Sequence, residues 1–327
     1  MRSFSAAEVH AALDYPSLVE ALRDVFRQGG EAMPVRQSYD VGFGGGAAHL
    51  LTMPAWERGK ALGVKLVTVF PQNAKRGIGA VSSLYVLLDG ETGVPRAMID
   101  GEALTNRRTA AASALASSYL SRPDSTTLLM IGTGHVAHHL PLAHAAVRPI
   151  RNVMVWGRHA ERAAALAATL NDKGLAAKPV TDLDAAMAQA DIVSCATTAS
   201  EPLVGGKHLR PGTHVDLVGA FTPTMRESDD EAVLRSSVFV DTYAGALAEA
   251  GDILLPMAAG LWKAEAICGD LHELTSGAKP GRRDTAEITL FKSVGAAIED
   301  LAAATLLDSG TGPAASKPQT GLRSVRG

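Results

Sequence analysis

The sequence predicts an α/β protein with two domains. The chain has 327 residues, and a typical size of roughly 150 residues per domain favours two. From Thr126 onward, short apolar segments alternate with helical segments, which is typical of a parallel sheet covered by helices on both faces. Residues 1–100 instead show helical spacing followed by β-type runs joined by turns. We therefore expect an α+β domain followed by a parallel α/β domain.

The first domain is expected to begin with helices. Ser5 and Glu8 have the spacing of a capping box, and Pro16 restarts a helix a few residues later. Four β-type runs follow, and residues 89–93 have the composition of a hairpin loop. The strands that we expect are 49–53, 62–70, 83–89 and 95–99.

The second domain is expected after an alanine-rich helix over 104–120. Short apolar runs, with helical segments between most of them, predict strands at 127–131, 153–156, 192–196, 215–218 and 238–241. A last apolar helix is expected over 293–307. The remaining residues, 309–327, are rich in Gly, Pro, Ser and basic side chains, which predicts a flexible tail.

Composition narrows the class of partner. The hydrophobic fraction of 46% and charged fraction of 20% are those of a globular protein rather than a disordered one. With 31 basic and 34 acidic residues, the chain lacks the basic footprint of a nucleic-acid-binding protein. No apolar run approaches the ~18 residues of a membrane span, and we see no signal peptide. We therefore expect a small-molecule partner, with neither nucleic acid nor membrane involved.

Cysteine and histidine usage argues against disulfides and metal. Cys195 and Cys268 have no CxxC spacing, so neither a disulfide framework nor a zinc site is supported, and a cytoplasmic location fits. His135 and His139 have the i, i+4 spacing of a zinc pair, but the glutamate of an H-E-x-x-H motif is missing. We expect no metal.

The strongest local motif follows the strand at 127–131. It reads Gly132-Thr133-Gly134-His135-Val136-Ala137, a G-x-G-x-x-A pattern between a buried strand and a helix expected to run to about Val147. The first glycine allows the tight turn, the second lets the backbone approach a pyrophosphate, and the alanine lets helix and strand pack closely. A plain tight turn could carry the same pattern. Its place in a strand–helix–strand unit favours a dinucleotide site with the pyrophosphate at the helix N-terminus.

The end of the next strand bears on the choice of dinucleotide. An acidic residue there usually binds the ribose 2′-hydroxyl of NAD, whereas an arginine can accommodate the 2′-phosphate of NADP. Gly157 occupies the acidic position and Arg158 follows it. This favours NADPH, with NADH possible, although Arg158 is also open to interpretation as a solvated residue at a helix start.

Four cations are candidates for binding a substrate anion, although Arg107 and Arg108 compete for one place. Lys65 lies in an alternating run of β-branched residues, where burial is costly unless an anion pairs with it; a lysine that snorkels at a sheet edge is the alternative. Arg107 and Arg108 project ~100° apart on a helix, so at most one points into a given site. The planar guanidinium of an arginine can bind a carboxylate through two hydrogen bonds, but an ion pair on the helix surface is the commoner arrangement. Arg36 is similarly ambiguous.

Five segments in one order carry a family resemblance. They are 63–73, 104–111, the Gly132 loop, 218–220 and 287–295. In these segments the chain resembles the ornithine cyclodeaminase/μ-crystallin family over about residues 1–308. The resemblance implies a homodimer and a discontinuous substrate-binding and dimerisation domain, 1–120 with 293–308. It also implies that 121–292 form an inserted NAD(P)-binding domain of the Rossmann type.

The resemblance also implies roles for single residues. Arg36, Lys65 and Arg108 match positions that hold the substrate carboxylate and flank the reacting carbon, so Lys65 and Arg108 are the expected catalytic residues. Contacts with cofactor or substrate are implied for Ser82, Ser83 and Thr109. The nicotinamide side of the cleft is expected to be lined by Thr197, Val218 and Ser293.

One departure from the family pattern bears on the reaction. Cyclodeaminases carry an aspartate in a Gly-Gly-Asp segment as acid/base, and here Phe221 occupies that position. A phenyl ring cannot shuttle a proton, and the nearest upstream carboxylate, Asp216, lies in a strand rather than in the cleft loop. The segment instead resembles the branch that reduces cyclic ketimines.

We therefore expect reduction of Δ1-pyrroline-2-carboxylate and Δ1-piperideine-2-carboxylate to L-proline and L-pipecolate. The expected partner is a cyclic imino acid. Three alternatives stay open: ornithine cyclodeaminase, an alanine-type dehydrogenase, and a non-catalytic protein that binds NADPH and a ligand in the manner of μ-crystallin.

Overall fold

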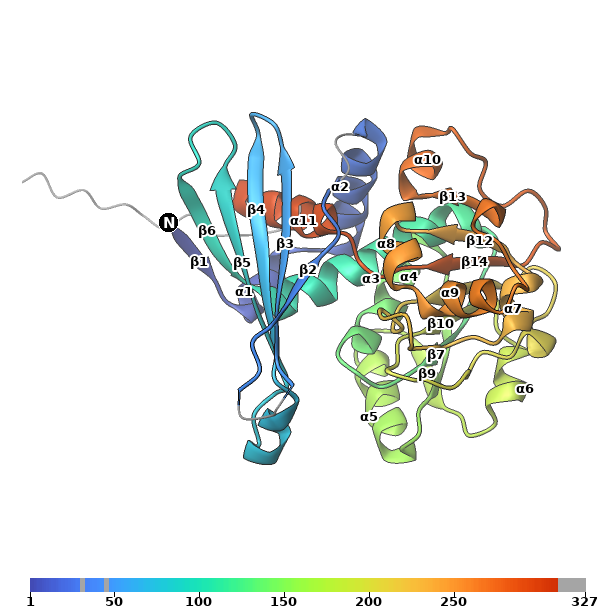
Figure 1. Ribbon diagram of the computed structural model, residues 1–327. Helices are drawn as coiled ribbons and strands as arrows, with labels where there is room; N and C mark the ends of the chain where they lie inside the picture. The colour runs from blue at the N-terminus through green and yellow to red at the C-terminus, as the bar shows by residue number, and fades with distance from the viewer. Residues whose placement is uncertain (30–32, 44–46, 311–327) are drawn as a thin grey trace, which may run out of the picture.

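The computed structural model describes residues 1–29, 33–43 and 47–310. These residues form two separate sheets, and helix α3 (Gly101–Leu120) runs from one toward the other (Figure 1). This mixed α/β architecture confirms the predicted fold class. The expected tail, 309–327, lies outside the described residues from 311 onward.

The first sheet has six strands in the order β1-β6-β5-β4-β3-β2. Neighbouring strands are antiparallel except that β1 pairs parallel with β6. The four expected strands are confirmed, whereas the short β1 and β2 were not predicted. Their bounds are β1 Arg2–Phe4, β2 Gln37–Asp40, β3 His49–Glu57, β4 Ala61–Val69, β5 Val81–Asp89 and β6 Pro95–Asp100.

Helices cover one face of this sheet. The predicted capping box of Ser5 and Glu8 is present at the start of the first helix, and Asp14 caps the second. Side chains that alternate along the strands, such as Tyr85 and Leu87, are buried on the helical side. The helices of this half are α1 Ala6–Ala12, α2 Tyr15–Gln28, α3 and α11 Ala297–Ser309.

The opposite face carries a second set of apolar side chains. Val64 on β4, Val86 on β5 and Met98 on β6 lie on it, and each is half-buried rather than buried. We call this set, with Leu62 and Leu66 of β4, the open face of the sheet.

The second sheet has eight parallel strands in the order β13-β12-β14-β11-β10-β7-β8-β9. Its strands are β7 Thr127–Ile131, β8 Asn152–Trp156, β9 Ala176–Pro179, β10 Ile192–Cys195, β11 His214–Leu217, β12 Ser237–Val240, β13 Ile267–Asp270 and β14 Thr289–Lys292. The five expected strands are confirmed, and β9, β13 and β14 are additional. The strand order reverses at β7, where an open α/β sheet leaves a crevice for a ligand.

Shorter helices connect these strands. The α-helices are α4 Leu140–Val147, α5 Ala160–Asn171, α6 Leu183–Met187, α7 Asp230–Leu234, α8 Tyr243–Glu249, α9 Gly251–Ala258 and α10 Leu271–Ser276. The 3₁₀ turns are η1 Pro71–Arg76, η2 Val136–His138, η3 Gly206–His208 and η4 Ala264–Ala266.

Two helix predictions are corrected at their starts. The last helix was expected from residue 293, but β14 ends at Lys292 and the α-helix begins only at Ala297, after an extended connection. The helix after the glycine motif is divided, because a 3₁₀ turn precedes α4 and Pro141 occupies the first turn of α4. Apolar periodicity does not reveal either break.

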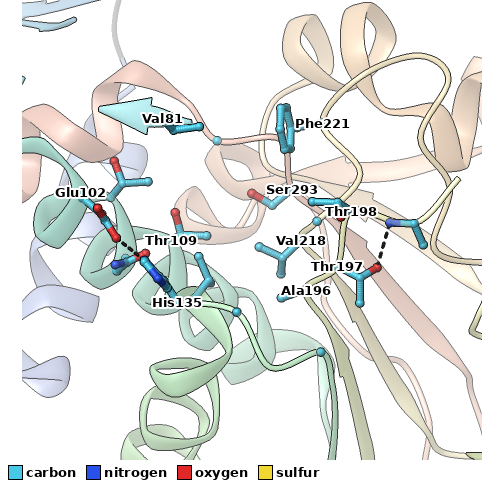
Figure 2. Close-up of a pocket in the computed structure, with 18 of the residues that line it drawn as sticks. Val81, Glu102, Thr109, His135, Ala196, Thr197, Thr198, Val218, Phe221 and Ser293 are labelled. Carbon is cyan, nitrogen blue, oxygen red and sulfur yellow. Dashed lines mark hydrogen bonds and ion pairs between the residues drawn. The ribbon is translucent and has the colours of Figure 1, made fainter. Parts of the chain in front are cut away.

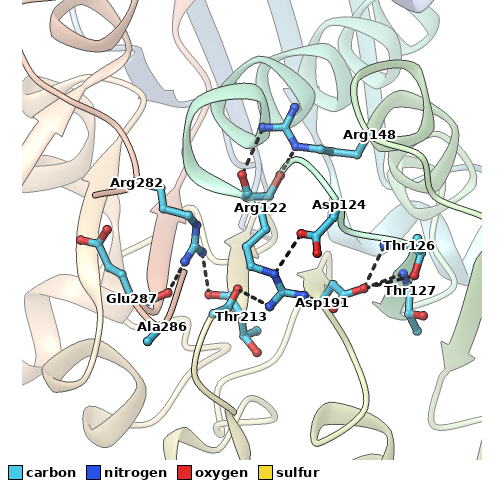
Figure 3. Close-up of polar contacts among 12 residues, drawn as sticks. Arg122, Asp124, Thr126, Thr127, Arg148, Asp191, Thr213, Arg282, Ala286 and Glu287 are labelled. Carbon is cyan, nitrogen blue, oxygen red and sulfur yellow. Dashed lines mark hydrogen bonds and ion pairs between the residues drawn. The ribbon is translucent and has the colours of Figure 1, made fainter. Parts of the chain in front are cut away.

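Arginines fix the C-terminal end of α3 to the second sheet (Figure 3). Arg148 donates to the carbonyls of Ser117 and Ser118 at 2.9 and 2.8 Å, and Arg282 donates to that of Leu120 at 2.7 Å. The carbonyls of Ser118 and Leu120 are among those that a helix leaves without partners at its C-terminus, whereas that of Ser117 also accepts from the N–H of Ser121. The contacts hold α3 in one orientation between the sheets.

Candidate active site

A cavity of about 1000 Å³ lies between the two sheets. Its walls come from β4 and α3 on one side and from the ends of β7, β8, β10 and β11 on the other (Figure 2). The segment between β14 and α11 completes the wall with Ser293 and Gly295. The strand ends that contribute are carboxyl ends, the edge at which parallel sheets bind ligands.

The glycine motif forms the floor of the cavity at the reversal of strand order. Gly132 has φ +116°, and a Cβ there would lie 2.5 Å from the carbonyl oxygen of Ala196, so no other residue fits. A Cβ at Gly134 would meet nothing within 4 Å, which leaves that backbone open to a ligand. Thr133, His135 and Val136 line the cavity with both glycines. Ala137 is buried where the turn packs on the sheet, and does not line it.

The lining of this loop suits a dinucleotide. Gly134, His135 and Val136 line the cavity at the start of the turn η2, and N–H groups at the start of a helical turn favour a pyrophosphate. His135, which contacts the carboxylate of Glu102, closes one side of the loop (Figure 2). A dinucleotide on this loop would extend over β8 in one direction and over β10 and β11 in the other.

The β8 end of the cavity carries positive charge. Gly157 packs closely, since a Cβ there would lie 2.7 Å from Cγ2 of Thr133. Arg158 lines the cavity with an exposed side chain, and Arg162 from the first turn of α5 also lines it. The position directly after β8 holds no carboxylate.

The β10 and β11 end holds the three residues expected at the nicotinamide side. Thr197, Val218 and Ser293 all line the cavity. Ser293 donates a hydrogen bond to Asp241 Oδ2 at 3.1 Å, which fixes its hydroxyl.

Lys65 and Arg108 meet at the end of the cavity beneath the first sheet. The Lys65 side chain is 3% exposed, and its Nζ lies 2.8 Å from Asp300 Oδ2 and 3.3 Å from the hydroxyl of Thr105. Arg108 is equally buried, with Nε 3.0 Å from Asp300 Oδ1 and Nη1 2.7 Å from Glu299 Oε2. Asp300 therefore bridges both cations. Lys65 is therefore a buried lysine paired with an anion, and not a lysine that snorkels at the sheet edge.

The neighbouring Arg107 points elsewhere. It donates to the carbonyl of His10 at 2.6 Å, and its guanidinium lies over the ring of Tyr15. Only Arg108 of this pair faces the cavity, as the ~100° step between successive helical residues requires.

Burial changes the proton affinity of these groups. Burial and the nearby Arg108 lower the pKa of Lys65 to about 8. Burial raises the pKa of Glu299 to about 7, against the opposing effect of Arg108. Burial also acts to raise the pKa of Asp300, but Arg108 and Lys65 outweigh it and hold that pKa below its ordinary value. Near neutral pH the site therefore holds an ammonium that can release a proton.

Arg36 reaches the same cavity from the segment before β2. Its Nε lies 3.0 Å from Glu249 Oε1, and its Nη2 donates to the carbonyl of Val294. Each expected cation thus has an acidic partner that was not predicted. The signal for two of them was present, because Glu299 and Asp300 are adjacent carboxylates inside an otherwise apolar helix.

One expected contact residue is misplaced. Ser83 and Thr109 line the cavity, but Ser82 does not. Successive side chains of a strand point to opposite faces. Val81 and Ser83 therefore face the cavity, and Ser82 is turned away from it.

Phe221 lines the mouth of the cavity, where its ring stands across from Val81 (Figure 2). Asp216 does not reach the cavity: it is fully buried, and its Oδ2 accepts a hydrogen bond from Ser194 at 2.7 Å and contacts His144 Nε2 at 3.2 Å. The cavity wall at this point therefore presents a phenyl ring in place of an acid.

The described residues contain no group of three or more His, Cys, Asp or Glu side chains that could hold a metal ion. Nor does any helix there have the length and apolar character needed to cross a membrane.

Comparison with known proteins adds relatives of defined activity. The Δ1-pyrroline-2-carboxylate reductase of Paracoccus denitrificans is 40% identical over 298 residues, which are 91% of this chain and 93% of that protein. The structure of the Thermococcus litoralis Δ1-pyrroline-2-carboxylate reductase in complex with NADH and L-proline matches with a TM-score of 0.89 at 35% identity, covering 95% of this chain and 97% of that one.

A second solved structure is similar over the same extent. The archaeal alanine dehydrogenase dimer with bound NAD matches with a TM-score of 0.85 at 28% identity, covering 95% of each chain. The profile of the ornithine cyclodeaminase/mu-crystallin family matches residues 2–310. The chain therefore belongs to the ornithine cyclodeaminase/mu-crystallin family, as its ordered motifs predicted.

Proposed function

We propose that this protein, an NAD(P)H-dependent oxidoreductase acting on C=N bonds, reduces Δ1-pyrroline-2-carboxylate and Δ1-piperideine-2-carboxylate to L-proline and L-pipecolate. The observation that carries this proposal is the buried pair of Lys65 and Arg108, held by Asp300 in the cavity that also contains the dinucleotide loop. The relatives named for Δ1-pyrroline-2-carboxylate reduction support it.

The substrate places a carboxylate directly on its imine carbon. The forks of Arg108 and Arg36 match a carboxylate, and both line the cavity. Holding the carboxylate there would orient the imine carbon toward the β10 and β11 end. Positioning of this kind can contribute up to about 7 to 11 kcal/mol of the rate enhancement.

The reaction transfers a hydride to carbon and keeps a proton on nitrogen. A reduced nicotinamide supplies the hydride when it is bound. The ring nitrogen must be protonated for the imine carbon to be electrophilic. Lys65, whose pKa is lowered to about 8, is placed to help hold the carboxylate and to maintain this proton.

Two alternative reactions are less well supported. Ornithine cyclodeamination needs an acid/base at the position of Phe221, and Asp216 is enclosed in the sheet. An alanine-type dehydrogenase is favoured only by the similar fold of the archaeal enzyme, at 28% identity. It would reduce pyruvate only in the presence of ammonia.

The preferred cofactor is proposed to be NADPH, with NADH accepted. Arg158 and Arg162 line the β8 end, where a 2′-phosphate would lie, and Gly157 stands where NAD enzymes usually carry an acid. The similar structures contain NADH or NAD, so the preference rests on this charge alone.

We also propose a cytoplasmic homodimer. The open face of the first sheet is apolar, and the helices of the described residues lie on its other face (Figure 1); such open faces are usually buried against a partner. A second copy would cover it, and the similar alanine dehydrogenase is a dimer. Both cysteines are free thiols, which suits a reducing compartment. The proposed domains are 1–120 with 293–308 for substrate and dimer contacts, and 121–292 for the cofactor.

A substrate panel tests the proposed reaction. Purified protein is incubated with NADPH or NADH and each of four substrates: the two ketimines, ornithine, and pyruvate with ammonia. Oxidation of NADPH with both ketimines, and none with the other two, is expected. Ammonia release from ornithine without net nucleotide change would instead identify a cyclodeaminase, and nucleotide binding without any turnover would identify a binding protein.

A further inference from the structure

A buried carboxylate joins two loops that form the cavity wall. Glu227 is fully buried and does not itself line the cavity. Its Oε1 accepts hydrogen bonds from the N–H of Thr197 at 2.6 Å and from the hydroxyl of Thr197 at 2.9 Å. Its Oε2 accepts from the N–H groups of Gly219 and Ala220 at 2.7 and 3.3 Å. One side chain thus connects the loop after β10 with the loop after β11.

The two loops also touch directly. A Cβ at Gly219 would lie 2.0 Å from the carbonyl oxygen of Thr197, so the backbones are as close as glycine permits. Both residues line the cavity, with Val218 and Phe221 beside them. A change in the spacing of these loops would therefore move the cavity wall itself.

Glu227 is in turn held by a second layer of buried charge. Asp252, in the first turn of α9, accepts hydrogen bonds through Oδ1 from the N–H groups of Glu227 and Ser228, both at 2.8 Å. Lys292, at the end of β14, places Nζ 3.2 Å from Asp252 Oδ2. All three charged side chains are fully buried. Burying three charged side chains costs free energy, and apolar side chains of similar volume would stabilise the fold equally well. Stability alone therefore does not explain these charges.

We infer that Glu227 is a positioning residue for the nicotinamide half of the cofactor. The inference rests on the cofactor placement proposed above, with the pyrophosphate on the Gly132 loop. That loop fixes one point of the dinucleotide, so the position of the nicotinamide depends on the wall formed by the β10 and β11 loops. Glu227 sets the separation of those loops through hydrogen bonds to both.

The test is the E227Q variant. Glutamine keeps one acceptor oxygen but turns an NH₂ group toward backbone N–H donors, so one of the two loops loses its bonds while the side-chain volume is kept. The matched control is D191N. Asp191 also accepts hydrogen bonds from two backbone N–H groups, those of Thr126 and Thr127 at 2.9 and 3.0 Å (Figure 3), but it directly precedes β10, at the amino end of that strand, and does not line the cavity.

The deciding readout is nucleotide affinity, measured by fluorescence titration with NADPH and NADH in the absence of substrate. E227Q is expected to weaken nucleotide binding roughly tenfold, the effect of one lost buried hydrogen bond, whereas D191N is expected to lower the thermal midpoint and leave affinity unchanged. In turnover with a ketimine, E227Q should lower kcat while the KM for the imino acid stays the same. Affinity is independent of substrate identity, so it tests the inference even if the proposed reaction is wrong.

Equal nucleotide affinity for E227Q, D191N and the natural protein would overturn the inference and leave Glu227 a structural group. If E227Q does not fold, D252N takes its place. This variant leaves the Glu227 carboxylate intact. The uncharged side chain of asparagine accepts weaker hydrogen bonds from the N–H groups of Glu227 and Ser228. Weakened nucleotide affinity in D252N would support the inference, and unchanged affinity would overturn it.

Discussion

At the scale of single residues, the site depends on cations that the fold buries and then pairs. Lys65 and Arg108 come from different elements, β4 and α3, and share the carboxylate of Asp300 from a third, α11. An unpaired lysine in this position would lose its proton or destabilise the fold. Pairing keeps the ammonium charged near neutral pH while burial leaves its pKa near 8.

The pKa of Lys65 predicts how activity depends on pH. In the proposed reaction the ammonium is the active form, so kcat/KM should fall as pH rises through about 8, where the ammonium loses its proton. The control is K65R, whose guanidinium stays charged over the whole range. The substrate imine also loses its proton as pH rises, but this affects the pH profiles of K65R and the natural protein equally. The difference between the two profiles therefore measures the deprotonation of Lys65. Identical profiles would contradict its role.

Arg158 predicts the choice of nucleotide. Replacing it by aspartate, R158D, removes the cation proposed to pair with a 2′-phosphate and places an acid one residue after Gly157, the position at which NAD enzymes usually carry the acid for the ribose 2′-hydroxyl. The ratio of kcat/KM for NADH to that for NADPH should rise by roughly tenfold or more, the value of one charge-assisted contact. An unchanged ratio would show that Arg158 is only a solvated residue at the β8 end.

At the scale of elements, the two glycines in the turn after β7 have different roles. Gly132 is required by conformation and by contact with Ala196, whereas Gly134 has open space around its Cβ position. The first is thus a requirement of the fold, and the second is free to serve the ligand.

This difference predicts opposite effects for two similar substitutions. G132A should destabilise the protein by about 1–3 kcal/mol through backbone strain, and it should weaken nucleotide binding as well. G134A should leave the thermal midpoint unchanged and still weaken binding, because the added methyl group stands where the pyrophosphate approaches. Differential scanning fluorimetry with and without NADPH compares them. Full NADPH affinity in G134A would place the pyrophosphate elsewhere.

Some elements of the fold could be predicted from the sequence and others could not. The long strands of the first sheet and the five apolar strands of the second were predictable, because each has a clear period or a continuous apolar run. β14 was not predicted, although it lies within the family motif 287–295. Arg108 could be narrowed to one of two arginines by helical geometry, but its partners Glu299 and Asp300 come from a helix almost two hundred residues away, roughly the length of a whole domain.

At the scale of the whole molecule, the chain returns to its first sheet after forming the second. Strand β14 lies in the interior of the second sheet, between β12 and β11, and α11 then packs on the first. The return brings Asp300 of α11 to Lys65 of β4. The end of the cavity that contains Lys65 therefore depends on residues from early and from late in the chain. Local sequence patterns carry no information on this closure, and only the ordered family motifs pointed to it.

The open face of the first sheet predicts dimerisation. In V64D, a charge at the centre of this face would be buried without a partner in the dimer, and the protein should sediment as a monomer. L234D is the control, because Leu234 is already 51% exposed on α7. Analytical ultracentrifugation of both variants is the measurement. A V64D protein with the same mass as the natural one would exclude this face as the interface.

The central claim is imine reduction in the cavity between the two sheets. The most direct measurement incubates the protein with Δ1-pyrroline-2-carboxylate and NADPH, follows nucleotide oxidation, and determines the proline formed by chiral chromatography. We expect one L-proline for each NADPH oxidised, with no D-proline, and near-complete loss of both signals in R108A, which lacks the guanidinium proposed to bind the carboxylate. Oxidation of NADPH without proline, racemic proline, or full activity in R108A would rule out the proposed reaction in this cavity.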